Sequence, residues 1–356
     1  MEKKKIGTKG LSFRFIVIGI TASAILTGVW ISFWPGKTMA AESINLMMNG
    51  GAFQKLAEKL VIGPFEKKYG VTVNVTPGLS QQMLSRLKAE KMNPSQDVVN
   101  LDLGPTIIGS TEGLFEKINP ANIPNIKDLD EIAINKDGLG PITTSHVICL
   151  AYNSEYMKKP IPKSWMDLWN PIYKDTIVLT TPELSSGLLF ILHISMLNGG
   201  SYENIDPGIE MIKKLKPNIR RWAVNHAEIL KALHTEDMIA LSTTTSTFVE
   251  AGLSGKPIKP ILLNDGNILS PATVQIVKGT KKRELVEKYI NEYLSPEAQL
   301  GWADEYNVLV FNKKVKFPAN IRERLPSPGQ TVLYDFAKIS KNLEKWVEKF
   351  TREIKR

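Results

Sequence analysis

The chain has 356 residues, of which 43% are hydrophobic and 23% are charged, so it is long enough to form two globular domains. Its formal net charge is +9, but residues 1–41 hold six of the lysines and arginines and only one glutamate. The remaining 39 basic and 35 acidic residues leave the body of the protein at about +4. That charge is too small to indicate a nucleic-acid-binding protein.

The N-terminus has the three parts of an export signal. A basic segment, Lys3–Lys9, precedes the apolar run Phe15–Trp34, and Thr38-Met39-Ala40 places small residues where a signal peptidase reads. We expect cleavage after Ala40 and a periplasmic location for the mature protein. The apolar run is also close to the ~20 residues that span a bilayer, so an uncleaved membrane anchor is the alternative.

The chain shows little sign of catalytic or metal-binding chemistry. Its one cysteine, Cys149, lies in an apolar run and is expected to be buried. The four histidines lack metal-ligand spacing, and neither Gly-x-Ser-x-Gly nor His-Glu-x-x-His occurs. We therefore expect no cofactor, no metal site and no catalytic residues, with an extracytoplasmic enzyme as the alternative.

The first predicted unit is a strand, a turn, a helix and a second strand. Ile44–Met48 is a short apolar strand, and Phe53–Phe65 has apolar residues at helical spacing up to Gly63-Pro64, which should break or kink the helix. Val71–Val75 alternates as the second strand. Glycines between the first strand and the helix permit a close approach of the backbone at the sheet edge where α/β proteins bind small ligands.

The same alternation continues along the first part of the chain. Ser80–Lys91 and Thr106–Phe115 have the pattern of helices, and Asp97–Leu103 that of a buried strand between them. Strands that alternate with helices predict an α/β fold with a mainly parallel sheet and helices on both of its faces.

A second α/β lobe is expected to begin near Gly138–Thr144. Val147–Tyr152 and Thr176–Thr180 have the pattern of strands, and a long amphipathic helix ends the chain. Two lobes joined by a hinge would close around a ligand in the cleft between them. The expected boundaries are an N-lobe of residues 42–142 and 271–313, a C-lobe of residues 143–270, and a C-terminal helical segment, 314–356, that returns to the C-lobe.

Four segments resemble, in chain order, bacterial extracellular solute-binding proteins of the spermidine/putrescine type, the ligand receptors of ABC importers. They read NGGAFQKLAEKLVIGPFEKKYGVTV, QDVVNLDLGPTIIGSTEGLFEKIN, PIPKSWMDLWNPIYKDTIVL and ELVEKYINEYLSPEAQLGWADEYNVLVFN. The resemblance implies a two-lobed type II periplasmic-binding-protein fold with mixed, mostly parallel sheets. It also implies capture of a small polar solute and its delivery to the membrane permease of an ABC importer. We expect a monomer; a membrane-tethered solute sensor is an alternative.

The resemblance does not extend to the residues that would select a polyamine. Receptors of this type that bind polyamines use carboxylates for the ammonium groups and aromatic rings around the methylenes. The positions expected to carry a tryptophan and an aspartate hold Ser270 and Ala272. Ferric-iron relatives use a tyrosine pair near Leu241–Phe248, which here contains threonine and serine. Polyamine binding is therefore an alternative, and iron is not expected.

The candidate ligand-binding residues lie where strands end and helices begin. Hydroxyls and N–H groups at helix starts favour an anionic group on the solute, whereas aspartates favour an amine. Both solute classes therefore stay open. A tight turn is the structural alternative for Asn49-Gly50-Gly51, and capping a helix or turn is the alternative for Asp102, Ser185-Ser186 and the hydroxyl run Ser242–Ser246. The predicted ligand-binding residues are Asn49, Gly50, Gly51, Asp102, Ser185, Ser186, Thr243, Thr244, Asp265 and Ser270.

Overall fold

The computed structural model describes residues 42–235 and 238–355. The predicted signal peptide, its cleavage position and the apolar run lie outside the described residues. The strands are β1 (Ser43–Met48), β2 (Thr72–Pro77), β3 (Val98–Asp102), β4 (Phe115–Glu116), β5 (Ile142–Asn153), β6 (Ile177–Thr180), β7 (Ile219–Ala223), β8 (Ile239–Thr243), β9 (Ile258–Ile261), β10 (Asn267–Val277), β11 (Leu309–Val310) and β12 (Thr331–Val332).

Helices separate most of these strands, as the alternation in the sequence predicts. They are α1 (Ala52–Ala57), α2 (Gly63–Tyr69), α3 (Ser80–Ala89), α4 (Leu103–Thr111), α5 (Ser185–Leu197), α6 (Asp206–Leu215), α7 (His226–Thr235), α8 (Thr244–Ser254), α9 (Arg283–Tyr293), α10 (Pro296–Tyr306), α11 (Ala319–Arg322) and α12 (Phe336–Glu353). Among the described helices, none combines the length and the apolar character needed to cross a membrane.

The helix after β1 continues through the predicted break. A π-helical segment, Glu58–Ile62, joins α1 to α2, and Pro64 lies in the first turn of α2. Proline needs no N–H partner there, and the wider π-turn accommodates its ring without ending the helix. The helix ends at Gly70, which adopts a left-handed conformation with φ 66°.

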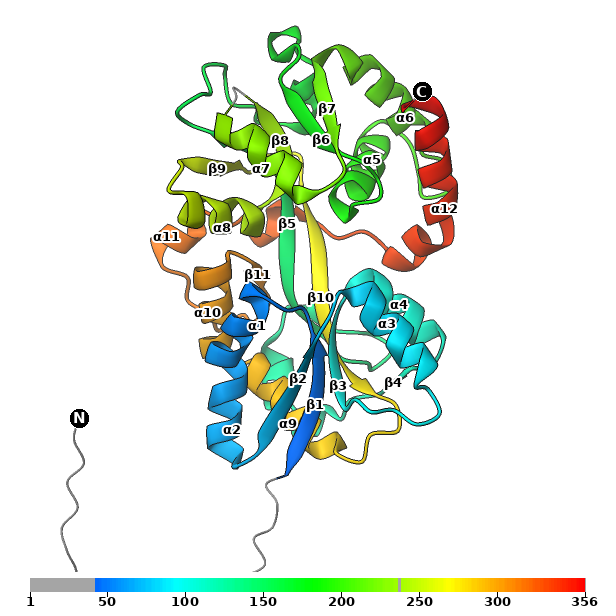
Figure 1. Ribbon diagram of the computed structural model, residues 1–356, viewed down its shortest axis with the longest axis vertical. Helices are drawn as coiled ribbons and strands as arrows, with labels where there is room; N and C mark the ends of the chain where they lie inside the picture. Colours follow the sequence, from blue (N-terminus) through cyan, green and yellow to red (C-terminus); the bar gives the residue numbers. More distant parts are fainter. Residues whose placement is uncertain (1–41, 236–237, 356) are drawn as a thin grey trace, which may run out of the picture. The chain divides into compact units, whose positions relative to one another are not determined.

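The strands form one mixed sheet in the order β2-β1-β3-β10-β5-β8-β6-β7. β1 pairs in parallel with β2 and β3, and β6 pairs in parallel with β7 and β8, so each end of the sheet has the parallel character that the sequence predicts. The two long central strands, β5 and β10, pair with each other antiparallel and run from one lobe into the other (Figure 1).

Each lobe has its own large hydrophobic core. The first is built from β1, α1, α2, α9 and α10, and the second from β6, α5, α6 and α12. On β5, Val147 belongs to the first core and the next residue, Ile148, to the second. On β10, Leu269 belongs to the first core and Ile268 to the second. These residues are paired across the two strands, Val147 with Leu269 and Ile148 with Ile268.

The C-terminal part of the chain contributes to both cores. Val315, Phe317 and Ile321 pack with the first core, whereas Trp346 and Phe350 of α12 are buried in the second. α12 therefore lies against the C-lobe, next to α6 and α5 (Figure 1). Cys149 is buried as predicted, and burial raises the pKa of its thiol, so it behaves as a small apolar side chain.

Candidate functional site

A cleft of about 800 Å³ is lined by both lobes. The N-lobe contributes the ends of β1, β2 and β3 and the starts of α3 and α4, and the C-lobe contributes the start of α5 and one face of α12. The residues that line the cleft include Asn49, Gly50, Asp102, Glu183, Ser185, Leu188, Leu189, Ser270, Phe336, Ile339 and Leu343.

The turn after β1 reaches the cleft through two of its three predicted residues. Asn49 and Gly50 line it, and a Cβ atom added to Gly50 would lie 3.1 Å from Cβ of Pro77. Gly51 does not line the cleft; it precedes α1 with φ 67°, a conformation that favours glycine. Gly50 therefore allows the turns after β1 and β2 to pack closely, and Gly51 serves the backbone turn.

Asp102 presents a carboxylate to the cleft. Its backbone is fixed on both sides: its N–H donates to Oγ of Ser80 at 3.2 Å, and the Thr106 hydroxyl donates to its carbonyl oxygen at 3.0 Å. Asp102 is the residue that precedes α4, yet its side chain makes no capping hydrogen bond. Among the described residues, the half-buried Asp102 carboxylate has no hydrogen-bond or ion-pair partner.

The start of α5 forms the facing wall. Ser185 is exposed and lines the cleft, whereas Ser186 is buried and its hydroxyl lies 2.9 Å from that of Thr180, with which it shares a hydrogen bond. A Cβ atom added to Gly187 would lie 2.3 Å from the carbonyl oxygen of Thr180. The glycine therefore lets the first turn of α5 approach β6, and Ser186 fastens that turn.

The predicted hydroxyl run after β8 lies away from the cleft. The Thr243 side chain accepts a hydrogen bond from the backbone N–H of Ser246 at 3.1 Å and caps α8. Thr244 is fully buried, and its hydroxyl donates to the carbonyl oxygen of Asn307 at 3.0 Å. Neither Thr243 nor Thr244 lines the cleft. Their hydroxyls are used inside the protein, one for a helix cap and one for a link to the end of α10.

Asp265 also has internal partners instead of a position in the cleft. Its carboxylate accepts hydrogen bonds from Oγ of Ser164 at 2.6 Å and from the backbone N–H of Trp165 at 3.0 Å. It thereby fixes the short 3₁₀ helix Trp165–Trp169. Ser270, by contrast, lies on β10 opposite His146 and lines the cleft. Of the two predicted aspartates, the structure therefore places only Asp102 at the cleft.

Most of the C-lobe wall was not predicted from the sequence. Phe336, Ile339 and Leu343 of α12 line the cleft, and they belong to the apolar stripe of the C-terminal helix. A stripe of this kind normally faces a core. Nothing in the apolar pattern of the 18-residue helix separates the residues that line the cleft from those that face only the core. Glu183, two residues before α5, was also missed.

The charges that line the cleft have one sign. Its two charged residues are Asp102 from the N-lobe and Glu183 from the C-lobe, and no lysine, arginine or histidine among the described residues lines it. The rest of the wall combines small polar groups with the apolar side chains of α4, α5 and α12. Such a surface suits a small solute that carries positive charge next to apolar carbon atoms.

Comparisons with known proteins agree with this arrangement. The sequence pattern of the family described as bacterial extracellular solute-binding protein matches residues 61–324. The chain is 24% identical over 315 residues to the gamma-aminobutyric acid-binding protein of Pseudomonas aeruginosa. The matched region covers 83% of this chain and 85% of that protein. It is also 24% identical over 192 residues to the spermidine/putrescine-binding periplasmic protein of Salmonella typhimurium, or 52% of this chain and 55% of that one.

Solved structures of the same kind share the fold. The crystal structure of an ABC transporter protein from Clostridium perfringens has a TM-score of 0.77 at 22% identity and covers 87% of this chain and 99% of that one. The two-lobed arrangement of the periplasmic binding proteins is thus the fold of this chain as well.

Proposed function

Because this chain belongs to the bacterial extracellular solute-binding protein family, and is a solute receptor of an ABC importer, we propose that its solute is a small amine held by Asp102. The observation that carries the proposal is the carboxylate of Asp102, which lines the cleft without a hydrogen-bond or ion-pair partner among the described residues. A half-buried anion of this kind is stabilised by a cationic hydrogen-bond donor, which a protonated amine supplies.

The relatives are consistent with an amine. The names of the two relatives above specify gamma-aminobutyric acid and spermidine or putrescine, and each of these solutes carries at least one amino group. The apolar wall of Leu188, Leu189 and Phe336 would pack against the methylene groups that these solutes share.

A solute that also carries an acidic group is the second candidate. Leu184, the N-cap residue of α5, makes no side-chain capping hydrogen bond, and Ser185 at that start lines the cleft. The N–H groups of a first helical turn favour an anion. An amino acid would therefore place its ammonium group on Asp102 and its carboxylate on the opposite lobe.

The proposal includes export of the protein to the periplasm. Export through the N-terminal signal, cleavage after Ala40 and release of the mature protein into the periplasm would bring it to the outer face of its permease. The cleft needs no catalytic group for this function.

We place the hinge at the paired residues Val147–Leu269 and Ile148–Ile268, where β5 and β10 pass from the first core to the second.

The proposal is tested by a thermal-shift screen of the protein from residue 41 onward. The panel is gamma-aminobutyrate, putrescine and butylamine, with butyrate and phosphate as solutes that lack an amine. A bound amine at about 100 times its dissociation constant adds ~2.7 kcal/mol to the free energy of unfolding and raises the melting temperature by several degrees. A shift with the amine-free solutes alone would overturn the proposal.

The Asp102→Asn variant locates the amine. Loss of the charged partner should weaken amine binding ~10- to 100-fold, because hydrogen bonds to charged groups contribute ~1.5–3 kcal/mol. The matched control is Asp137→Asn, which removes the same charge from an exposed residue outside the cleft. Isothermal titration calorimetry gives both affinities, and equal amine binding by the two variants would exclude Asp102 as the amine site.

A further inference from the structure

The two carboxylates of the cleft differ in what surrounds them. Asp102 has no ion-pair partner among the described residues, whereas Oε1 of Glu183 lies 2.9 Å from Nζ of Lys355. Glu183 lines the cleft from the C-lobe and Asp102 from the N-lobe, and Lys355 follows the end of α12 without lining the cleft itself. The protein thus supplies an ammonium group of its own to the second carboxylate.

The position of Lys355 is set by the packing of α12. The residue before it, Ile354, is buried in the second core, and the backbone N–H of Lys355 donates to the carbonyl oxygen of Phe350 at 3.4 Å. Phe350 is itself fully buried. Because Phe350 and Ile354, which precede Lys355, are both buried in the second core, Lys355 is held close to Glu183.

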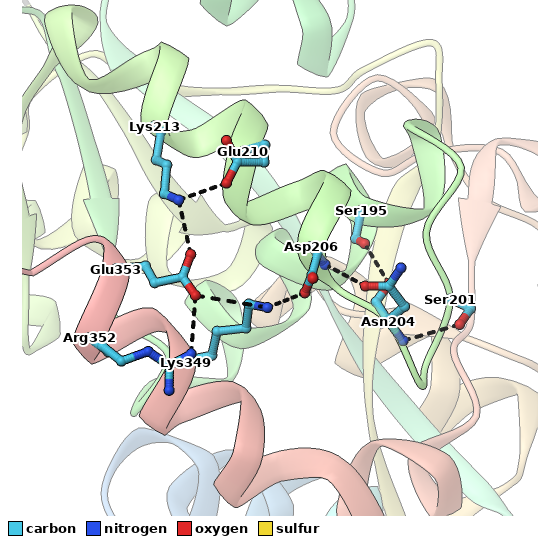
Figure 2. A network of polar contacts seen from close by, with 9 residues as sticks. All are labelled: Ser195, Ser201, Asn204, Asp206, Glu210, Lys213, Lys349, Arg352 and Glu353. Carbon is cyan, nitrogen blue, oxygen red and sulfur yellow. Dashed lines mark hydrogen bonds and ion pairs between the residues drawn. The ribbon is translucent and has the colours of Figure 1, made fainter.

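An ion-pair network fixes the same end of α12 to α6 (Figure 2). Glu353 pairs with Lys213 of α6 at 2.9 Å and with Arg352 at 3.1 Å, and Lys349 pairs with Asp206 at the start of α6. Individual surface pairs contribute little, but several of them on one helix end restrict its movement. The network therefore keeps the segment that carries Lys355 against the C-lobe.

We propose that Lys355 is a specificity-determining residue whose ammonium group occupies, at Glu183, the place that the second ammonium group of a diamine would take. The inference depends on the proposed function, since it assumes an amine at Asp102. With Glu183 already paired, the cleft has one free carboxylate and selects solutes with one ammonium group over diamines. A zwitterion gains additional affinity from this pair. Its carboxylate lies near a Glu183 carboxylate that Lys355 has neutralised, so the two acidic groups do not repel each other.

The chemistry of Glu183 agrees with this role. Burial by itself would raise the pKa of Glu183, but hydrogen bonds, including the one from Lys355, lower the pKa below the usual range. Glu183 is therefore ionised at neutral pH and would attract another ammonium group if Lys355 were removed. The side chains of Glu183 and Lys355 are 50% and 34% exposed, so the pair is screened and the selectivity it provides is several-fold.

The test compares butylamine with putrescine, which have the same carbon chain and differ by one ammonium group. Isothermal titration calorimetry is carried out on the wild type, Lys355→Met and Lys345→Met. Lys345 is the control, because it is an exposed lysine of the same helix with no ion pair among the described residues. Lys355→Met should shift the affinity ratio toward putrescine ~3- to 5-fold, or make putrescine binding detectable, and Lys345→Met should leave the ratio unchanged.

The double variant Glu183→Gln/Lys355→Met separates a local pair from a general change in charge. It should lose the shift toward putrescine, because the carboxylate that would receive the second ammonium group is gone. An unchanged ratio in Lys355→Met, or an equal shift in Lys345→Met, overturns the role of Lys355 and leaves the amine receptor standing. Absence of binding by every amine of the screen would overturn the proposed function and this inference together.

Discussion

Gly187 shows at the scale of a single residue how tightly the C-lobe wall is built. The carbonyl oxygen of Thr180 occupies the space where a Cβ atom would be, at 2.3 Å. Any side chain must push α5 away from β6, and with it Ser185 at the cleft. The sequence showed a glycine near a helix start but not the strand that presses against it, because that contact depends on the fold.

Gly187→Ala should therefore destabilise the protein by ~1–3 kcal/mol, the usual cost of forcing an extra group into a packed site. The control is Gly252→Ala within α8, where an added Cβ atom meets no atom within 4 Å and alanine is the better helix former. Urea denaturation measures both free energies of unfolding. Equal stabilities of the two variants would show that α5 is not held this closely.

His193 is the residue whose protonation should link stability to pH. Burial lowers the pKa of His193 to about 4, although the nearby Asp265 carboxylate acts in the opposite direction. In the unfolded chain the pKa of histidine is ~6.5, so the unfolded state takes up the proton first as the pH falls. The contribution of neutral His193 is complete above pH ~6.5 and is lost as the pH falls toward 4.

His193→Gln removes this titration and keeps a polar side chain near the Tyr334 hydroxyl, which lies 2.7 Å from Nδ1 of His193. Between pH 7 and pH 4.5 the wild type should lose up to about 2.5 kcal/mol more free energy of unfolding than the variant. Denaturation curves at the two pH values give the difference. The same pH dependence in both proteins would contradict the assignment to His193.

At the scale of elements, α12 has two functions that its sequence combines in one stripe. Trp346 and Phe350 are buried in the second core, and Leu343 lines the cleft. Ile339 and Phe336 do both, because they pack in or against the second core and also line the cleft. The amphipathic pattern correctly predicted the helix and its apolar face. It could not divide that face between core and cleft, because both environments accept the same side chains.

Trp346→Ala should cost ~3–5 kcal/mol of unfolding free energy, since the Trp346 side chain is among the largest that are fully buried. Glu353→Gln, which weakens the ion pairs with Lys213 and Arg352, should cost less than about 1 kcal/mol. Chemical denaturation compares the two. A larger loss in Glu353→Gln would mean that ion pairs, and not core packing, hold α12 in place.

The predicted ligand-binding residues fall into two groups: those that line the cleft and those whose side chain or backbone has a structural role inside the protein. Asn49, Gly50, Asp102, Ser185 and Ser270 line the cleft, and their part in binding stays a prediction. Internal hydrogen bonds hold the side chains of Ser186, Thr243, Thr244 and Asp265. Gly51 serves the backbone turn before α1. Strand-to-helix positions were identifiable from periodicity. Their partners were not, since Thr244 meets Asn307 and Asp265 meets Ser164 only after distant segments have folded together.

For the whole molecule, the two-lobed α/β fold was the most predictable property. Alternating strands and helices, followed by a change of pattern near Gly138–Thr144, predicted two lobes, and the related structures confirm that fold. The pairing of β10 between β3 and β5 was beyond reach, because long-range strand order leaves no local signal in the sequence. The two long strands β5 and β10 connect the lobes, and Ser270 of β10 lines the cleft.

The central claim is that an amine lies between the lobes on Asp102, and a crystal structure with the tightest-binding amine of the screen tests it most directly. We expect the amine nitrogen within ~2.7–3.2 Å of a carboxylate oxygen of Asp102, with the carbon chain against α5 and α12. A solute bound in the cleft with its nitrogen turned away from Asp102, or a solute bound outside the cleft, would contradict the account.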